Sequence, residues 1–408
     1  MNSQSAHFDL KHNDPTSARS CLQQVLTRVV SVNPNGKSKI DAMKYLRNLL
    51  TTEARSFAFL AIETIGMMEL HMSASMSDTM RSPLVCMVLL AWYLVVTYLV
   101  GAGCQKSDLS MCRQLLAPLI KSYPDGAIVL FLRARFFLVS GNLDTAIFFY
   151  NKSIEAQDVY HQFHHICYWE LLFAYSYMRR WDRAANHAKR LLDQSRWSRC
   201  VYTYMLAILI NADTTVSINK RSETVRMLLV KIPSIRLRIA GKSIPVEKFA
   251  ERKAQRYLRR GNLYYPHYEF MYFWNGFSIL DGHPNFVRPI LDDIESTWRS
   301  NPNDDPDDES LYLFLMGVCY RSLKENYKAE DCFLRVMENE KRLTDHFYLA
   351  PNACFELALV SADLNRAEEV EVLLARARAY KGYSLETKLH FRIHCAMEKY
   401  SGARTPIN

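Results

Sequence analysis

The segment from Tyr160 to Cys167 holds residue types that could bind a metal ion. His161 and His165 are one helical turn apart, and His164 and Cys167 lie beside them. Imidazole and thiolate groups at such spacing can hold zinc. The segment continues directly into an aromatic helical pattern, however, and the sequence offers no second pair of ligands. We therefore interpret these histidines as packed or hydrogen-bonded side chains and predict neither a metal site nor a cofactor.

A second short motif resembles a phosphate-binding loop. It reads Ile239-Ala240-Gly241-Lys242-Ser243, but the full motif needs a glycine five residues before Gly241, where this sequence has Arg236. Glycine is also scarce, with 13 in 408 residues, against an average of about 7%. The nucleophile-elbow motif GxSxG, the zinc-protease motif HExxH and the kinase motif HRD do not occur. We therefore discount nucleotide binding and predict that the protein is not an enzyme.

Positive charge gathers in the segment from Lys231 to Arg260. It holds ten Lys and Arg against two Glu, in a chain whose formal net charge is +9. The basic patch on the helix predicted from Val246 comprises Lys248, Arg252, Lys253, Arg256, Arg259 and Arg260. Such a run is a solvated helix face, a surface for nucleic acid or an anionic membrane, or the counterpart of the acidic stretch Asp292–Glu309.

The aromatic residues of this predicted helix argue against nucleic acid. Phe249 and Tyr257 fall on one apolar stripe, together with Ala250 and Ala254. Because that stripe faces inward, no aromatic stacking platform accompanies the charges. We favour the acidic stretch or a protein partner as the counterpart of the basic patch, and we disfavour nucleic acid.

Helices have to position these segments, and one stretch sets their pattern. Asp125 to Asp158 reads as two amphipathic helices joined at Ser140-Gly141-Asn142. Tetratricopeptide hairpins repeat about every 34 residues, with small residues where the two helices cross. Ala134 and Ala146 hold those positions, and Gly141 ends the first helix where a left-handed cap is needed. The stretch therefore predicts one helical hairpin of a repeat protein.

Further copies of this hairpin precede and follow it. Cys112, Ala184, Gly317 and Ala329 fall in register with its small residues, and a degenerate copy runs from Pro351 to about Tyr380. Solenoid repeats need neighbours to bury their faces, and about three are needed for stability. The sequence predicts an all-α fold, a tetratricopeptide-repeat superhelix of helical hairpins (an α-solenoid) with an irregular helical middle section.

The pattern divides the chain into five sections. We predict a disordered leader over residues 1–15, amino-terminal helices over 16–80, tetratricopeptide-like repeats over 81–206, an irregular section over 207–310, and carboxyl-terminal repeats with a capping helix over 311–400. The amino end lacks the apolar stretch of a secretion signal, and the ten cysteines form no CxxC pair. These features predict a cytoplasmic protein, or one that is also nuclear, with reduced cysteines.

One segment is apolar enough to cross a membrane. Leu84 to Cys104 has no charged residue and is long enough to span a bilayer. Trp92, Tyr93 and Tyr98 lie inside the run instead of at its ends. The run also forms the first helix of the repeat whose second helix holds Cys112. We predict a core helix, disfavour a membrane span and keep peripheral lipid contact as an alternative.

A series of motifs identifies a resemblance to a known family. The motifs are Tyr123-Pro124-Asp125-Gly126, Gln162 to Leu171, Trp197-Ser198, Ile239 to Pro245, Glu247 to Ala250, Arg252-Lys253, Met271-Tyr272, Trp274-Asn275-Gly276, Pro351-Asn352-Ala353 and His390 to Ile393. From about Ser82 to Met397 the chain resembles the tetratricopeptide repeat thirty-nine family, which is related to fungal inclusion body clearance proteins. The resemblance implies non-enzymatic adaptors, some linked to lipid homeostasis, inclusion clearance or cilium assembly. Residues 1–80 depart from the family's pattern.

The predicted superhelix offers a concave groove to protein partners. The first helix of each repeat lines this groove, and aromatic residues and Arg are enriched at binding hot spots. The predicted groove residues are Phe131, Arg135, Leu138, Trp169, Phe173, Tyr177, Phe314, Val318 and Arg321. We therefore predict a protein-binding scaffold. The alternatives are a groove that the chain fills itself, and a lipid- or membrane-surface-associated protein that uses residues 84–104 and 231–260.

Overall fold

The computed structural model describes residues 66–75, 82–100, 106–237 and 243–401. The chain divides into two compact units, Met1–Val85 and Cys86–Asn408, and the helical hairpins lie in the second. The leader predicted over 1–15, most of the helices predicted over 16–80 and the Ile239–Lys242 motif lie outside the described residues. Among the residues described, the regular elements are helices and none is a strand. The predicted all-α fold is confirmed.

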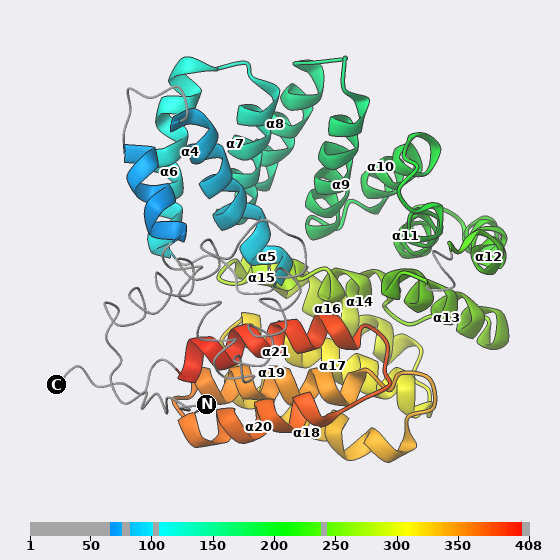
Figure 1. Ribbon diagram of the computed structural model, residues 1–408. Helices are drawn as coiled ribbons and strands as arrows, with labels where there is room; N and C mark the ends of the chain where they lie inside the picture. Colours follow the sequence, from blue (N-terminus) through cyan, green and yellow to red (C-terminus); the bar gives the residue numbers. More distant parts are fainter. Residues whose placement is uncertain (1–65, 76–81, 101–105, 238–242, 402–408) are drawn as a thin grey trace, which may run out of the picture. The chain divides into compact units, whose positions relative to one another are not determined.

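Antiparallel helical hairpins build the second unit (Figure 1). The hairpins are α7 (Ala127–Val139) with α8 (Leu143–Glu155), α9 (His161–Tyr177) with α10 (Trp181–Gln194), α11 (Arg199–Ala212) with α12 (Ile218–Ile235), α17 (Pro306–Ser322) with α18 (Asn326–Glu338), and α19 (Leu349–Asp363) with α20 (Ala367–Ala379). Neighbouring hairpins also pack on one another, α8 on α9, α10 on α11 and α18 on α19. This stacking is the tetratricopeptide-like solenoid that the sequence predicts.

Four of these hairpins turn in the same way. The residue two places after the first helix has a left-handed backbone, with φ of 76° at Gly141, 57° at Arg179, 63° at Lys324 and 59° at Asn365. In each turn the next N–H donates to the carbonyl five residues earlier, at 2.8 to 2.9 Å. Of these four residues only Gly141 is a glycine, the residue type that indicates a left-handed turn. In a non-glycine residue this conformation raises the free energy by about 1–2 kcal/mol. Sequence patterns therefore reveal one of the four turns.

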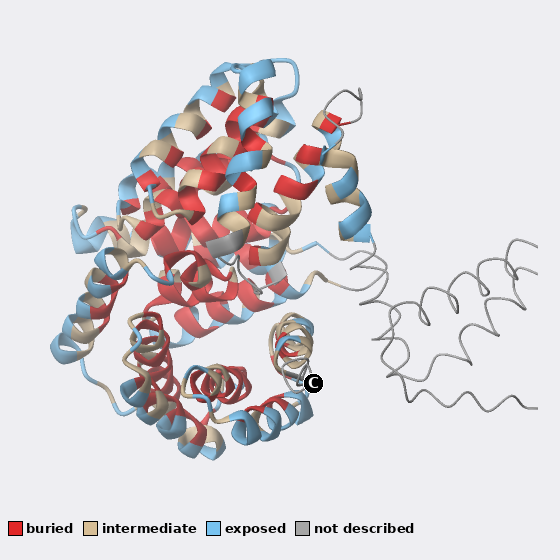
Figure 2. Ribbon diagram, turned by 90° about the vertical axis from the view of Figure 1, so that its left-hand side faces the viewer, coloured by how far each residue is buried: buried red, intermediate tan, exposed pale blue. Residues whose placement is uncertain are grey.

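Small residues lie where the hairpin helices cross, as predicted. The fully buried ones are Cys112, Ala134, Ala146, Ala184 and Ala329. At Gly317 of α17, an added Cβ would lie 2.7 Å from the Phe333 ring of α18. Only a glycine lets these two helices approach so closely. Buried residues gather on the helix sides that face one another (Figure 2).

The remaining helices flank the hairpins or fill the space between them. They are α4 (Ser82–Ala91), the π-helical η1 (Trp92–Val96), α5 (Thr97–Val100), α6 (Lys106–Ser122), α13 (Pro245–Arg260), α14 (Pro266–Phe273), α15 (Gly276–Leu280), α16 (Pro284–Ser300), the 3₁₀-helical η2 (Asn339–Arg342) and α21 (Glu386–Ser401). Short α14 packs on α11 and α17, and α15 packs on α7, α9 and α17 (Figure 1). Two helices of the section predicted as irregular therefore lie inside the repeats.

The apolar run is buried on one face only. Its window Ser82–Leu99 has a mean hydropathy of 2.0 and is long and apolar enough to cross a membrane, with 33% of its residues buried. Leu90 and Leu94 have no exposed area, whereas Leu84 is 63% and Val88 53% exposed. Helix η1 packs on α6, the helix that holds Cys112, and on α7. The prediction of a fully buried segment therefore fails at Leu84 and Val88.

Candidate protein-binding site

The predicted groove residues lie mostly in the interior. Seven of them are buried: Phe131, Arg135, Leu138, Phe173, Tyr177, Phe314 and Val318. Tyr177 lies against Gly276 of α15, where an added Cβ would be 3.0 Å from the tyrosine ring. Phe314 packs on Tyr272 of α14, with ring centroids 4.8 Å apart. Helices α14 and α15 of the same chain therefore fill much of the concave side, and the predicted groove remains accessible only at Trp169 and Arg321, both partly exposed.

The two groove arginines form ion pairs within the fold. Arg135 of α7 donates to a backbone carbonyl of η1 at 2.6 Å and pairs with Glu170 of α9. Burial opposes the charge of Arg135, but Glu170 raises the pKa of its guanidinium above the ordinary value. Arg321 of α17 pairs with Glu356 of α19 at 3.0 Å, and Glu356 also pairs with Arg392 of α21 at 2.9 Å. Neither groove arginine is free to bind a partner's carboxylate.

Three tryptophans from distant parts of the sequence gather beside the filled interior. The Trp169 ring of α9 is 4.8 Å from Trp274, which follows α14, and 6.4 Å from Trp197 in the α10–α11 loop. Trp197 is 50% exposed, and the other two are partly exposed. We call Trp169, Trp197 and Trp274 the tryptophan cluster. It is an accessible group of large aromatic rings where the concave side is left uncovered.

A lysine without a counter-ion adjoins the tryptophan cluster. Lys388 of α21 places its Nζ 5.7 Å from the Trp274 ring centroid, and within the described chain its ammonium has no hydrogen-bond or ion-pair partner. Lys388 also lines a cavity of about 10 Å³ between α14, α19 and α21, enough for about one water. Trp274 Nε1, Asn275 Oδ1 and Arg392 Nε are buried there or nearby without partners. The region therefore retains unused hydrogen-bonding capacity.

Two more cations flank Trp197 in the chain, and a third follows a residue of α13 that bonds the adjacent Ser198. Arg196 and Arg199 are exposed on either side of the Trp197-Ser198 pair. Ser198 Oγ donates to the Glu247 carboxylate of α13 at 2.5 Å, which places the exposed Lys248 next to this loop. Over the described ranges, none of the three cations belongs to an ion pair. The site therefore combines accessible aromatic rings with unpaired positive charge.

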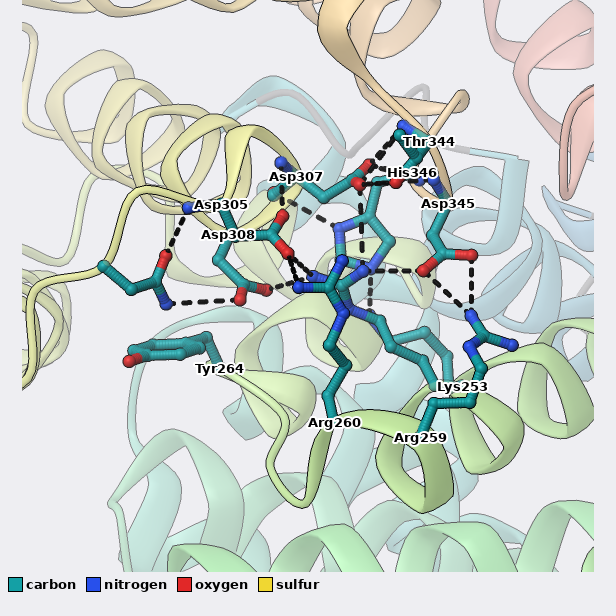
Figure 3. Close-up of polar contacts among 12 residues, drawn as sticks. Lys253, Arg259, Arg260, Tyr264, Asp305, Asp307, Asp308, Thr344, Asp345 and His346 are labelled. Carbon is teal, nitrogen blue, oxygen red and sulfur yellow. Dashed lines mark hydrogen bonds and ion pairs between the residues drawn. The ribbon is translucent and has the colours of Figure 1, made fainter.

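The predicted basic patch of α13 is only partly a surface. Lys253 is 3% and Arg256 2% exposed, whereas Lys248, Arg252, Arg259 and Arg260 are exposed. Arg256 lies 2.8 Å from Asp308 and 2.7 Å from Asp345, and Asp345 also pairs with Arg259 at 2.8 Å (Figure 3). Arg260 pairs with Asp305, which also lies 3.2 Å from Arg256. Residues of the acidic stretch therefore neutralise Arg256 and Arg260, and the buried Arg256 cannot serve an outside partner.

The buried Lys253 joins three elements in one closed polar network. Its Nζ lies 2.7 Å from Glu269 of α14 and 2.9 Å from His346 Nε2 in the loop before α19. Tyr348 also donates to Glu269. Burial and the charge of Lys253 lower the pKa of His346, so a neutral imidazole can accept from the lysine. Because the network is closed to solvent, we assign it to fold stability.

The histidine segment forms the start of α9. Asp158, His161 and His164 bring potential ligand atoms within 4.8 Å of one another. His165, which the sequence spacing pairs with His161, is not part of this group. His164 Nε2 is 2.7 Å from the Gln157 carbonyl. Burial lowers the pKa of His165, and His164 and His161 add to the effect. His164 is therefore hydrogen-bonded within the chain, which is the interpretation that the sequence favours.

Sequence reasoning did not assign Trp197, Trp274 or Lys388 to the groove. Trp197 lies in a loop and Trp274 between two short helices, so neither obeys the rule that first helices line the groove. Both stand in motifs that carry the family resemblance, Trp197-Ser198 and Trp274-Asn275-Gly276, and this signal could have found them. Lys388 has no such signal, because only the packing of α21 brings it to Trp274.

We expect Lys388→Met to stabilise the fold at neutral pH. Burial lowers the pKa of Lys388 to about 8, and Arg392 adds to the effect. The folded state therefore disfavours the charged form of the Lys388 side chain. The resulting loss of folding stability begins as the pH falls below the unfolded pKa of 10.5, and it is fully present below pH 8. At pH 7 the variant should gain about 1–2 kcal/mol, and the gain should vanish above pH 10.5. Urea unfolding across this range measures it, with exposed Lys121→Met as the control; an equal gain in the control would contradict the explanation.

Comparison with known proteins places these features in context. The sequence profile described as Iml2/Tetratricopeptide repeat protein 39 matches residues 57–323. Tetratricopeptide repeat protein ttc-39B of Caenorhabditis elegans is 49% identical over 343 residues, which are 84% of this chain and 59% of that protein. The chain thus spans less than two thirds of this relative's length. A solved structure of Naa15/Naa10 bound to HypK-THB covers 95% of this chain and 58% of that chain, at 9% identity and a TM-score of 0.27; similarity at that level supports no inference.

Proposed function

The chain belongs to the Iml2/Tetratricopeptide repeat protein 39 family, and from this membership we propose that it is a non-enzymatic scaffold that binds protein partners. Tetratricopeptide arrays bind peptides and helices. The observation that supports this role most directly is the tryptophan cluster, with Trp197 50% exposed. Tryptophan is enriched at the centres of protein interfaces. The unpaired cations around the cluster would help to orient a partner.

Four buried cysteines of the described residues are consistent with the non-enzymatic part of the proposal. Burial raises the pKa of Cys167 and Cys200 to about 12, and that of Cys332 and Cys354 to about 11. Thiols with such pKa values carry almost no thiolate at neutral pH, so they are poor nucleophiles. The buried Lys253 network is closed to substrates for a different reason, since its members have at most 3% exposure.

We also propose a place and a process for the scaffold, with the family resemblance and the free, buried cysteines as support. The place is the cytoplasm, or the cytoplasm and the nucleus, where thiols stay reduced. The process is, by the same resemblance, one of lipid homeostasis, inclusion-body clearance or cilium assembly. A biotin ligase fused to the full chain would identify the neighbours that distinguish these processes.

The proposed function is tested by reconstitution. Neighbours found by proximity labelling should be purified and mixed with the full chain, and the mixtures analysed by size-exclusion chromatography with light scattering. We expect at least one neighbour to form a discrete complex of defined stoichiometry. If the chain elutes alone with every purified neighbour, or converts a neighbour chemically instead of binding it, the scaffold function is contradicted.

A membrane-surface role is the second candidate, and the outer face of the apolar run favours it. Leu84, Val88 and Leu99 are 49% to 63% exposed on this segment. An apolar helix face of this kind can bury itself in the boundary of a bilayer. Flotation of the purified full chain with anionic vesicles tests this role. Binding that disappears in Leu84→Ser with Val88→Ser would support it, and absence of flotation would exclude it.

A further inference from the structure

We propose that the tryptophan cluster is the docking site for an acidic segment of a partner protein, in which carboxylates flank an apolar or aromatic anchor. The proposal rests on the scaffold function and specifies its partner. It assigns the anchor to the surface of Trp169, Trp197 and Trp274, and it assigns the carboxylates to the unpaired cations around them. Each part follows from a separate observation.

The tryptophan cluster forms a rigid apolar wall. Trp274 stacks on Phe270, with centroids 5.7 Å apart and an interplanar angle of 9°, and Trp169 leans on Phe173 at 5.4 Å. Tyr202 supports both Trp169 and Trp197, at 6.2 and 5.9 Å. Packing therefore fixes these rings before a partner arrives, which lowers the entropy cost of binding. A large anchor side chain can contact the accessible rings without rearranging them.

The charge around the wall is positive, because the nearby carboxylates are already engaged. Glu170 pairs with Arg135. Glu247 accepts from Ser198 at 2.5 Å and from the Leu237 N–H at 2.8 Å. Glu356 is shared by Arg321 and Arg392. Nothing in the described structure neutralises Arg196, Arg199, Lys248 or Lys388, so an acidic segment supplies the missing counter-charge.

Lys388 places a positive charge at the Trp274 end of the tryptophan cluster. Its ammonium lies over Trp274 at 5.7 Å, on α21, whereas Arg196 and Arg199 flank Trp197 on the far side of Trp169. The cations therefore stand at both ends of the aromatic wall. A partner with an anchor between two carboxylates matches this order, and an anchor at the end of an acidic run does not. Burial without a counter-ion destabilises the ammonium, so a bound carboxylate would relieve an unfavourable charge.

Ring geometry favours a protein over a single-stranded nucleic acid. Trp169 meets Trp197 at an interplanar angle of 80° and Trp274 at 62°. The central ring, Trp169, is therefore parallel to neither of its two tryptophan neighbours, whereas successive stacked bases require parallel faces. Insertion into a membrane is also disfavoured, because Trp169 and Trp274 are only partly exposed and cannot leave the wall. An anchor side chain of a peptide needs only the face of one ring and the edge of another to pack against, and the tryptophan cluster offers both.

The test begins with selection of peptides on the purified full chain. A phage-displayed library of random peptides should yield sequences with Asp or Glu on both sides of a Leu, Phe, Tyr or Trp. The most enriched peptide is then labelled, and its Kd is measured by fluorescence anisotropy at two salt concentrations. We expect binding to weaken as salt rises. Dye-labelled oligouridine serves as the single-stranded RNA probe under the same conditions.

Two sets of substitutions test whether the selected peptide binds at the tryptophan cluster. Trp197→Ala should weaken the selected peptide about 30-fold, and Arg196→Glu with Arg199→Glu should weaken it about 10-fold or more. Circular dichroism and the melting temperature check that these exposed substitutions leave the fold intact. The matched charge controls are Lys121→Glu and Lys341→Glu, both at exposed residues without ion pairs in the described structure, and they should bind like wild type.

Several results would overturn the proposal. They are selected peptides without paired carboxylates, no enrichment at all, or affinities that neither set of variants changes. Tight oligouridine binding that Trp197→Ala abolishes would assign the tryptophan cluster to RNA instead. A reconstituted protein partner that binds wild type and Trp197→Ala equally would preserve the scaffold function while removing this site from it.

Discussion

Replacing Asp307 with Ala should lower the free energy of unfolding by about 3–5 kcal/mol. Asp307 is fully buried in the first turn of α17. Its carboxylate accepts from the N–H groups of Thr344, Asp345 and His346 at 2.7 to 3.2 Å and from the Thr344 hydroxyl at 2.6 Å. It also lies 3.7 Å from Arg256. Alanine would leave several buried donors and part of an arginine charge without a partner.

Urea unfolding of the full chain at neutral pH measures this loss. Asp304→Ala is the matched control, because Asp304 belongs to the same acidic stretch but is exposed; its effect should stay within about 0.5 kcal/mol. Asp307→Asn keeps the shape and some acceptor capacity, so it should fall between the two. Equal stabilities for Asp307→Ala and Asp304→Ala would show that the network between α13, α17 and the loop before α19 contributes little.

Replacing Ala146 with Trp should cost about 3 kcal/mol or more, because it overpacks a helix crossing. Ala146 on α8 and Ala134 on α7 have no exposed area, and the two helices pack on one another. An indole at this point has to push α7 and α8 apart. The change should also disturb α9, which packs on α8.

Thermal unfolding followed by circular dichroism gives the measurement. Phe148→Trp introduces the same side chain on the same helix at a position that is 54% exposed, and it should leave the melting temperature nearly unchanged. A melting temperature for Ala146→Trp equal to that of wild type would contradict the assignment of Ala146 to the crossing, and with it the register of the hairpin.

The hairpins could be predicted from sequence because their signals are local. The small residues Ala134 and Ala146 and the turn at Gly141 lie within one repeat, so spacing alone reveals them. The turns at Arg179 and Lys324 use the same left-handed backbone without glycine, and residue type does not report it. The α11–α12 hairpin extends into the section predicted as irregular, because its second helix lies wholly within residues 207–310. Its turn has no left-handed residue, so the turn pattern of the other hairpins does not reveal it.

The candidate site depends on contacts that no local pattern contains. Trp169 and Trp274 are adjacent only because α14 and α15 fold back against the repeats, where α14 packs on Phe314 and α15 on Tyr177. Helical periodicity predicts that Arg256 is a surface charge. In the structure it is an interior residue, because Asp308 and Asp345 approach it from two other elements. Helix periodicity identifies which face a residue occupies. It does not identify what covers that face.

The central claim is that partners bind at the tryptophan cluster, and fluorine NMR tests it most directly. The chain has six tryptophans, so 5-fluorotryptophan labelling gives one resonance for each, assigned through single Trp→Phe variants. Addition of the reconstituted partner or the selected peptide should shift the resonances of Trp169, Trp197 and Trp274 and leave those of Trp181 and Trp298 in place. Shifts confined to Trp92, Trp181 or Trp298, with the cluster unchanged under saturating partner, would contradict the account.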